Sequence, residues 1–225
     1  MNIKEGIEKR FSVRAFTDQV PSIELIKEIL KTAGSAPSGG NIQPWKVYVL
    51  NENAKKSLSE KTLHNFDNGV QEEIEYEIYP KPLADEYKKR RYECGADMYN
   101  ALSIKEDDLD SRFKQIRENY KFFGAPIGMI VTIDRSFGKN GWGHVGMFLE
   151  NLWLSAIHHG LGICLQESWS IYPKTVKEFT KHPDNEIVWC GVAIGFEDSS
   201  HPINQYRTKS CLLYTSDAAD EELRG

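Results

Sequence analysis

Three apolar segments in the second half of the chain restrict its fold more than any other feature. Residues 127–133 and 187–196 are rich in β-branched and other apolar residues, which is typical of buried strands. Between them, residues 144–159 repeat apolar side chains at helical spacing and form the most hydrophobic helix that the sequence predicts. Helices and strands mix along the chain without a regular strand–helix–strand repeat, so we expect one α+β domain.

Shorter elements are expected around this centre. A helix should begin at Ser22, whose side chain can cap it, and end at Gly34. Residues 45–50 carry apolar side chains at alternate positions and predict a strand, whereas residues 35–44 and 160–168 are predicted as loops. Further helices are expected over residues 2–10, 52–64, 83–103, 107–122 and 174–181.

The composition is that of an ordinary globular protein. With 225 residues, 40% of them apolar and 27% charged, the chain can bury a substantial core and is not a disordered chain or a disulfide scaffold. The net charge of −5 argues against a protein that coats nucleic acid. The four cysteines lack metal-ligand spacing, which indicates reduced thiols in the cytoplasm and no zinc site. We find no signal peptide at the N-terminus and no apolar run near the ~20 residues that cross a bilayer.

An anion site is predicted near the N-terminus. In an extended segment Arg10, Ser12 and Arg14 point to one side, while Phe11 and Val13 face the core. Two guanidinium groups beside a hydroxyl suit a phosphate. The alternative is the solvated outer face of a strand.

The loop after the helix that ends at Gly34 carries two amide side chains. Its sequence is Pro-Ser-Gly-Gly-Asn-Ile-Gln-Pro-Trp over residues 37–45, and its glycines allow the backbone to approach a ligand. Asn41 and Gln43 offer both donors and acceptors, which match the edge of a heterocycle. An ordinary helix-to-strand turn explains the glycines but not the two amides.

A third segment, Gly-Leu-Gly-Ile-Cys-Leu-Gln-Glu-Ser over residues 160–168, follows the hydrophobic helix. It could present backbone N–H groups to a planar ring. The alternative reading, that Gly160 ends the helix, is compatible with this role.

In this order and spacing, the three segments resemble the FMN-dependent nitroreductase family, in particular its nitrobenzoate-reductase-like branch. Three more motifs carry the resemblance, which extends over about residues 3–210: Phe-Gly-Ala-Pro at 123–126, Cys-Gly-x-Ala-x-Gly at 190–195 and Pro-x-Asn-x-x-Arg-Thr at 202–208. The resemblance implies a nitroreductase-like fold with helices around a central, mostly antiparallel sheet. It also implies a two-fold homodimer with FMN at the interface.

The resemblance assigns roles to individual residues. Arg10, Ser12 and Arg14 would hold the phosphate and ribityl chain of FMN, and Asn41 and Gln43 would contact its ribityl and isoalloxazine side. The other expected cofactor-binding residues come from the partner subunit, from the backbone around flavin N5 and from the last motif: Pro37, Ser38 and Gly39; Gln166, Glu167 and Ser168; and Arg207.

The implied reaction is a ping-pong cycle. NAD(P)H would give a hydride to flavin N5 and leave, and a nitroaromatic or similar electron-poor acceptor would then take the electrons. No side chain is assigned as a catalytic acid or base. Acceptor choice should depend on the variable helical region 65–122, whose Phe66, Tyr76 and Tyr79 are candidates for stacking on a planar substrate or for core packing.

The C-terminal residues differ in character from the rest. Residues 211–225 continue no pattern of the domain, and their first six resemble the translated transposon-end adapter of DNA sequencing libraries. We therefore expect a domain over residues 1–210 and a non-native tail over 211–225, with a genuine polar tail as the alternative. The family places an arginine just after the Arg-Thr pair, where this chain has Ser210, and continues into an extension that wraps the other subunit. Phosphate affinity and dimer stability should both be reduced here.

Several other interpretations compete with this one. Residues 141–146 match G-x-G-x-x-G, which favours a dinucleotide-binding turn, although a glycine-rich turn capping the hydrophobic helix fits the preceding loop better. Adjacent His158 and His159 could bind a metal, but they point about 100° apart on a helix. Cys164 could be a nucleophile, but a small buried thiol is expected.

Two functional alternatives stay open. A reductive dehalogenase of the same fold, similar to the iodotyrosine dehalogenases, would use a Glu and Tyr pair such as Glu72 and Tyr76 in a lid. A flavin-binding storage or sensor protein without turnover would have the same binding residues.

Overall fold

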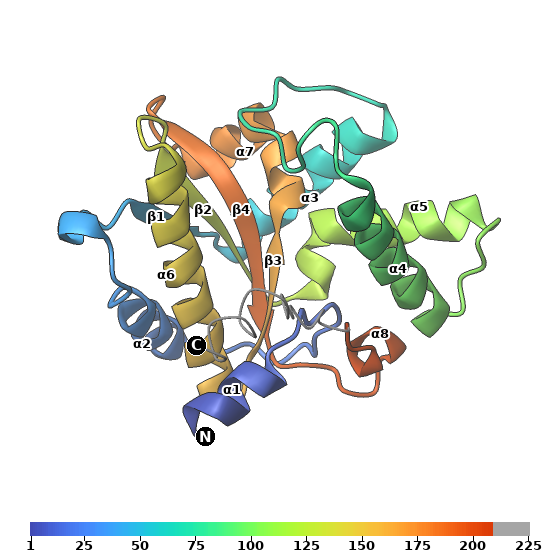
Figure 1. Cartoon of the computed structure of the whole chain (residues 1–225), viewed down its shortest axis with the longest axis horizontal. Helices are drawn as coiled ribbons and strands as arrows, with labels where there is room; N and C mark the ends of the chain where they lie inside the picture. Colours follow the sequence, from blue (N-terminus) through green and yellow to red (C-terminus); the bar gives the residue numbers. More distant parts are fainter. Residues whose placement is uncertain (209–225) are drawn as a thin grey trace, which may run out of the picture.

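A four-stranded antiparallel sheet forms the centre of the computed structural model, which describes residues 1–208 (Figure 1). Its strands lie in the order β1 (Trp45–Val49), β2 (Ile127–Asp134), β4 (Glu186–Gly195) and β3 (Gly162–Gln166). The expected α+β fold with a mostly antiparallel sheet is confirmed. The predictions for Ser210 and for residues 211–225 lie outside the described residues.

Helices cover both faces of the sheet, because side chains on β2 alternate between two apolar clusters. Met129 and Val131 pack against α2 (Ile23–Ala33) and α6 (Lys139–His158). Ile130 faces the other cluster. The helical elements that contribute to that cluster are α3 (Glu52–Asp67), η2 (Glu118–Gly124), η3 (Glu167–Ile171) and α7 (Pro173–Thr180).

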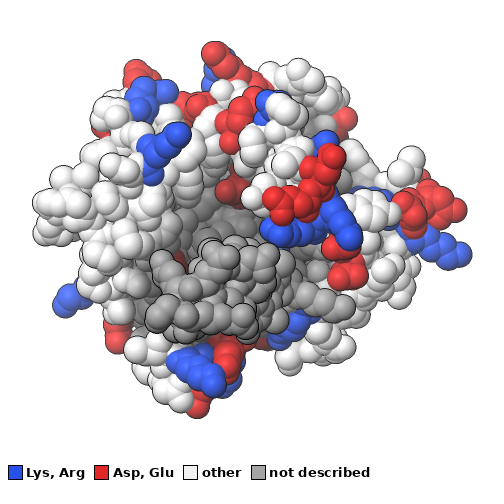
Figure 2. Space-filling view, viewed as in Figure 1, with Lys and Arg blue, Asp and Glu red and all other residues white. Residues whose placement is uncertain are grey.

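The remaining elements lie at the periphery. They are α1 (Ile3–Lys9), η1 (Gly39–Asn41), α4 (Asp85–Ala101), α5 (Leu109–Arg117) and α8 (Pro202–Gln205). Helix α4 buries no residue and stands beside α5 at one side of the molecule (Figure 1). On the face shown in Figure 2, acidic and basic side chains are interspersed. Among residues 1–208, no helix combines the length and the apolar character needed to cross a membrane.

Two sequence predictions are corrected here. Residues 160–168 were expected to form a loop, but five of them are strand β3, which pairs with β4 from Gly162↔Gly195 to Gln166↔Gly191. Helix α6 begins at Lys139 and therefore includes residues 141–146, which form neither a capping turn nor a dinucleotide-binding turn. The helix prediction for residues 107–122 is also divided, because Phe122 and Phe123 have φ of 52° inside η2.

A buried carboxylate begins β4. Glu186 Oε2 accepts hydrogen bonds from Tyr48 Oη at 2.8 Å and Thr132 Oγ1 at 2.5 Å, and Lys46 Nζ lies 2.9 Å from Oε1. Burial acts to raise the pKa of Glu186, but the hydrogen bonds from Thr132, Lys46 and Tyr48 outweigh it, so its pKa lies below 4.5. This carboxylate ties β1, β2 and β4 together.

Candidate functional site

The end of β3 opens into a cavity of about 500 Å³, which we call the β3–η3 cavity. Its walls come from β3, β4, η3, α6 and the variable region: Ile78, Tyr79, Arg91, Asn119, Leu149, Leu165, Gln166, Glu167, Ser168, Ile171, Trp189 and Cys190. All three residues expected near flavin N5 are therefore brought to one cavity. The size is that of a small-molecule site.

A glycine in β4 lets η3 lie directly against the sheet. A Cβ on Gly191 would stand 2.0 Å from Trp169 Cδ1, so any larger residue would displace η3. Gln166 fixes the same junction, because its Nε2 donates to the Asn119 carbonyl at 2.6 Å and its Oε1 accepts from Trp169 Nε1 at 3.4 Å. The backbone that carries Glu167 and Ser168 is thus held from two sides.

The polar groups of the cavity are incompletely satisfied. Ser168 Oγ is buried and has no hydrogen-bond partner within residues 1–208. Desolvation raises the pKa of Glu167, and desolvation followed by the nearby Glu167 charge raises the pKa of Cys190. Because buried polar groups are normally hydrogen-bonded, the free hydroxyl marks a place where a ligand can donate or accept.

The N-terminal arginine segment runs along the outer edge of β3. Ser12 pairs with Ile163 in a parallel bridge, and the Val13 N–H donates to the Ile163 carbonyl at 3.0 Å. A Cβ on Gly162 would stand 2.5 Å from Val13 Cγ2, so this approach requires glycine. Val13 is buried, as expected from alternation along an extended segment.

Ser12 and Arg14 face the Cys164 side of β3. Burial raises the pKa of the Cys164 thiol to about 11, against the smaller lowering effects of Arg14 and the Ser12 hydroxyl. The prediction that Arg10 points to the same side is wrong. Its guanidinium lies 4.7 Å from the ring centroid of Trp153 on α6, which belongs to the apolar cluster on the other face of the sheet from Cys164. Cys164 is therefore a buried thiol, as expected, and not an activated nucleophile.

Asn204 holds the arginine segment in place. The sequence analysis includes it in the motif over residues 202–208 but assigns it no role. Its Oδ1 accepts from the Arg14 N–H at 2.9 Å, and its Nδ2 donates to the carbonyls of Ala15 and Asp198, each at 2.8 Å. Arg207 follows on the same segment, stacks 3.4 Å from the ring centroid of Phe11 and donates to the Asn204 carbonyl. Arg10, Arg14 and Arg207 form no ion pair with a carboxylate in residues 1–208.

The amide loop occupies a separate part of the single chain. The Gly39 N–H donates to His144 Nε2 on α6 at 3.1 Å, and the Gln43 N–H donates to Ser38 Oγ at 3.0 Å. Gln43 Nε2 also donates to Asn41 Oδ1 at 3.0 Å, so the two amides expected to contact FMN hydrogen-bond to each other.

This loop is exposed and strained. Asn41 and Gln43 have φ of 56° and 47°, and Gly40, which precedes Asn41, has φ of 59°. Left-handed backbone in side-chain-bearing residues is uncommon and is found preferentially at functional sites. No hydrogen bond or ring contact in the described part of the chain connects residues 37–43 with residues 10–14, so their association around one ligand stays a prediction.

Comparison with known proteins identifies the relatives of this arrangement. A sequence model of the nitroreductase family matches residues 7–196. The chain belongs to the nitroreductase family. This family member is 35% identical over 201 residues to a 4-nitrobenzoate reductase of Nocardioides sp. (strain LMS-CY), covering 88% of this chain and 81% of the relative. It is 33% identical over 205 residues to a nitrobenzene nitroreductase of Ectopseudomonas oleovorans, covering 90% of each.

A solved structure of another nitroreductase has the same fold. A crystal structure of the FMN and NADPH-dependent nitroreductase NfnB from Sphigopyxis sp. strain HMH superposes with a TM-score of 0.92 at 34% identity, covering 95% of this chain and 96% of that one. The resemblance to the nitroreductase family and the expected fold are thereby confirmed.

The dehalogenase alternative has little support. An iodotyrosine dehalogenase 1 homolog of Caenorhabditis elegans matches over 59 residues, or 26% of this chain. Glu72 accepts from the Lys174 N–H at 2.7 Å at the start of α7, and Tyr76 donates to the Trp189 carbonyl at 2.5 Å. Both residues of the suggested lid pair thus have structural contacts.

The other candidates are also accounted for. Among residues 1–208, no group of three His, Cys, Asp or Glu side chains is arranged to hold a metal ion, and the His158 and His159 rings contact each other. Of the three proposed stacking aromatics, Phe66 packs on Phe113, whereas Tyr79 lines the β3–η3 cavity.

Proposed function

We propose that this protein is an FMN-dependent NAD(P)H nitroreductase that reduces a nitroaromatic or similar electron-poor acceptor. The observation that carries the proposal is the arginine segment on β3, next to a cavity lined by Ser168. Among residues 1–208, its guanidinium groups form no ion pair with a carboxylate, and the buried Ser168 hydroxyl has no hydrogen-bond partner. Relatives named for reduction of 4-nitrobenzoate and nitrobenzene, and a structural relative described as FMN and NADPH-dependent, support the same activity.

The residues present fit a phosphate-bearing cofactor. Arg14 and Arg207 lie on segments joined by Asn204, and Ser12 shares the Arg14 side of the strand edge. These groups, with Arg10, would bind the phosphate and ribityl chain, since guanidinium groups bind phosphate through charge-assisted hydrogen bonds.

The β3–η3 cavity would hold the ring of the cofactor. Ser168 Oγ and the backbone of Gln166 and Glu167 supply polar contacts, and Leu149 and Trp189 supply apolar walls that exclude water. When bound, FMN supplies a flavin that takes a hydride from NAD(P)H and passes electrons to the acceptor. Donor and acceptor would occupy the same cavity in turn, so the protein should show ping-pong kinetics.

We also propose that two chains form a homodimer in which residues 37–43 complete the partner's site. The exposure of Asn41 and Gln43 and the strained backbone around them support this arrangement. We further propose that residues 1–210 form one domain in the cytoplasm. The family match over residues 7–196 supports the domain, and the free Cys94, Cys164 and Cys190 support the location.

Flavin spectroscopy tests the proposal. Purified protein should be yellow or should bind added FMN, and anaerobic NADH or NADPH should bleach the flavin absorbance. A nitroaromatic should then restore it. If neither nucleotide bleaches the flavin, the proposed enzymatic activity is contradicted, and a flavin-binding protein without turnover is favoured.

A further inference from the structure

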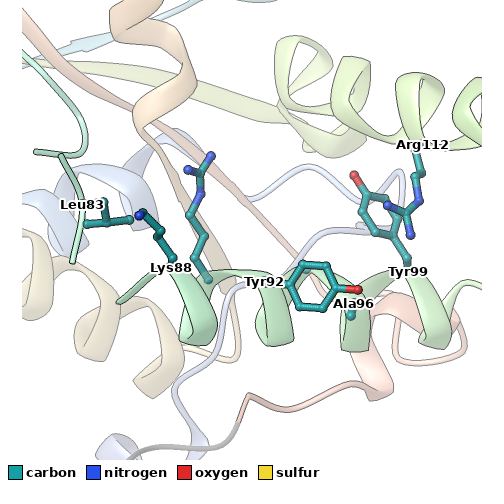
Figure 3. Close-up of a pocket in the computed structure, with 8 residues that line it drawn as sticks. Leu83, Lys88, Tyr92, Ala96, Tyr99 and Arg112 are labelled. Carbon is teal, nitrogen blue, oxygen red and sulfur yellow. The ribbon is translucent and has the colours of Figure 1, made fainter. Parts of the chain in front are cut away.

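A second pocket, which we call the α4 pocket, lies next to the proposed cofactor site. It has a volume of about 310 Å³ and follows one face of α4 with contributions from α5: Leu83, Lys88, Arg91, Tyr92, Gly95, Ala96, Tyr99 and Arg112. Figure 3 shows Tyr92 and Ala96 on α4 between Lys88 at one end and Tyr99 with Arg112 at the other. The small Gly95 and Ala96 give the face its depth, and two tyrosines give it planar walls.

The charges that line the α4 pocket are all positive. Lys88 pairs with Asp85 at 2.9 Å. Arg91 and Arg112 instead lie over tyrosine rings, at 4.3 Å from the Tyr79 centroid and 4.5 Å from the Tyr99 centroid, and neither pairs with a carboxylate within residues 1–208. On a chain of net charge −5, this is a local concentration of cations.

One further charge borders the pocket from outside its lining. The hydroxyl of Tyr92 donates to Glu106 Oε1 at 3.1 Å, and this contact raises the pKa of Tyr92. Glu106 is thereby held on the tyrosine hydroxyl and does not line the pocket.

Arg91 connects this pocket to the proposed active site. It lines both the α4 pocket and the β3–η3 cavity, and Tyr79, on which it stacks, lines the β3–η3 cavity as well. A guanidinium that is stacked on a ring keeps its N–H edge free for a bidentate carboxylate. The acidic side chain in the lining of this cavity is Glu167, at the start of η3.

We propose that Arg91 is a specificity-determining residue that binds the carboxylate of an aromatic acceptor. The acceptor ring lies among the apolar walls of the β3–η3 cavity, and its carboxylate lies at the α4 side. Arg91 is the basic side chain and Glu167 the acidic side chain in the cavity lining, so attraction by Arg91 favours this orientation, which directs the other end of the ring toward η3. The inference rests on the proposed nitroreductase function and names its substrate class as nitroaromatic carboxylates.

Matched acceptors with and without the anion test this proposal in the FMN-loaded protein. Arg91→Gln should lower kcat/KM for 4-nitrobenzoate by about tenfold or more, as expected for loss of a charge-assisted hydrogen bond. The same variant should change kcat/KM for nitrobenzene by no more than about twofold, and Arg91→Lys should fall between because lysine lacks the planar fork. Lys89→Gln is the control, since Lys89 is exposed on the same helix and 3.9 Å from Glu93.

A phosphate of the nucleotide is the other anion that Arg91 could bind. A change in KM for NAD(P)H with unchanged discrimination between the two acceptors would overturn the proposal in favour of that source. Equal losses with 4-nitrobenzoate and nitrobenzene would also overturn it. If the wild-type protein reduces neither acceptor, the proposed function fails. Calorimetric titration with benzoate then decides on Arg91, because weaker binding in Arg91→Gln supports the carboxylate site and unchanged binding refutes it.

Discussion

Replacement of Asn204 should damage both the stability of the fold and the cofactor site. The side chain is 1% exposed and makes three hydrogen bonds, to the Arg14 N–H and to the carbonyls of Ala15 and Asp198. Asn204→Ala leaves the Arg14 N–H without its acceptor and removes one of two donors from each carbonyl, because the Ala15 and Asp198 carbonyls also accept from backbone N–H groups. At about 1 kcal/mol for each lost bond, and more where a buried group stays unsatisfied, the free energy of unfolding should fall by about 3–5 kcal/mol.

Urea unfolding followed by tryptophan fluorescence measures this loss, and titration with FMN measures the effect on the site. FMN affinity should also fall, because Asn204 fixes the backbone that carries the Arg14 guanidinium. Gln205→Ala is the control on the exposed side of α8 and should change stability by no more than about 0.5 kcal/mol. A loss below about 1 kcal/mol in Asn204→Ala, or a folded variant with unchanged FMN affinity, would refute this reasoning.

Three further perturbations test other parts of the structure. Arg14→Ala should weaken FMN binding by about 1.5–3 kcal/mol, and an unchanged titration would remove Arg14 from the site. The pKa of Glu186 is depressed in the folded state, so its ionised carboxylate adds to the free energy of unfolding above pH 4.5. This stabilisation is lost as the pH falls through the folded-state pKa. The urea midpoint of Glu186→Gln should therefore depend less on acid pH than that of the wild type. Gly191→Ala should destabilise the protein by about 1–3 kcal/mol or more, since its Cβ would stand 2.0 Å from Trp169 Cδ1. Gly146→Ala, with open space at the Cβ in helix α6, should be neutral or stabilising, and equal losses in both glycine variants would contradict the packing argument.

Local chemistry made part of the fold predictable. Ser22 accepts from the Leu25 N–H at 3.2 Å and Gly34 ends the helix, as the sequence indicates. The strand over residues 127–133 could be predicted because an unbroken apolar run is buried on both faces. Strand β3 could not, because its five residues begin with a glycine and take their conformation from pairing with β4 and from the close approach of Val13.

The candidate site divides in the same way. Arg14, Ser168 and Arg207 could be singled out because they stand in motifs whose order is specific. The role of Asn204 could not be predicted from its place in a motif, since only the folded chain shows that its side chain accepts from the Arg14 N–H. The sequence did not single out Arg91, because an arginine in a charged helix is ordinary. Its position between two cavities arises from the packing of the variable region.

A crystal structure of the purified protein with FMN tests the central claim most directly. We predict flavin density in the β3–η3 cavity, its phosphate beside Arg14 and Arg207, and residues 37–43 of a second copy at the same flavin. Density for FMN elsewhere on the protein, or a saturated crystal in which this cavity holds none, would contradict the account.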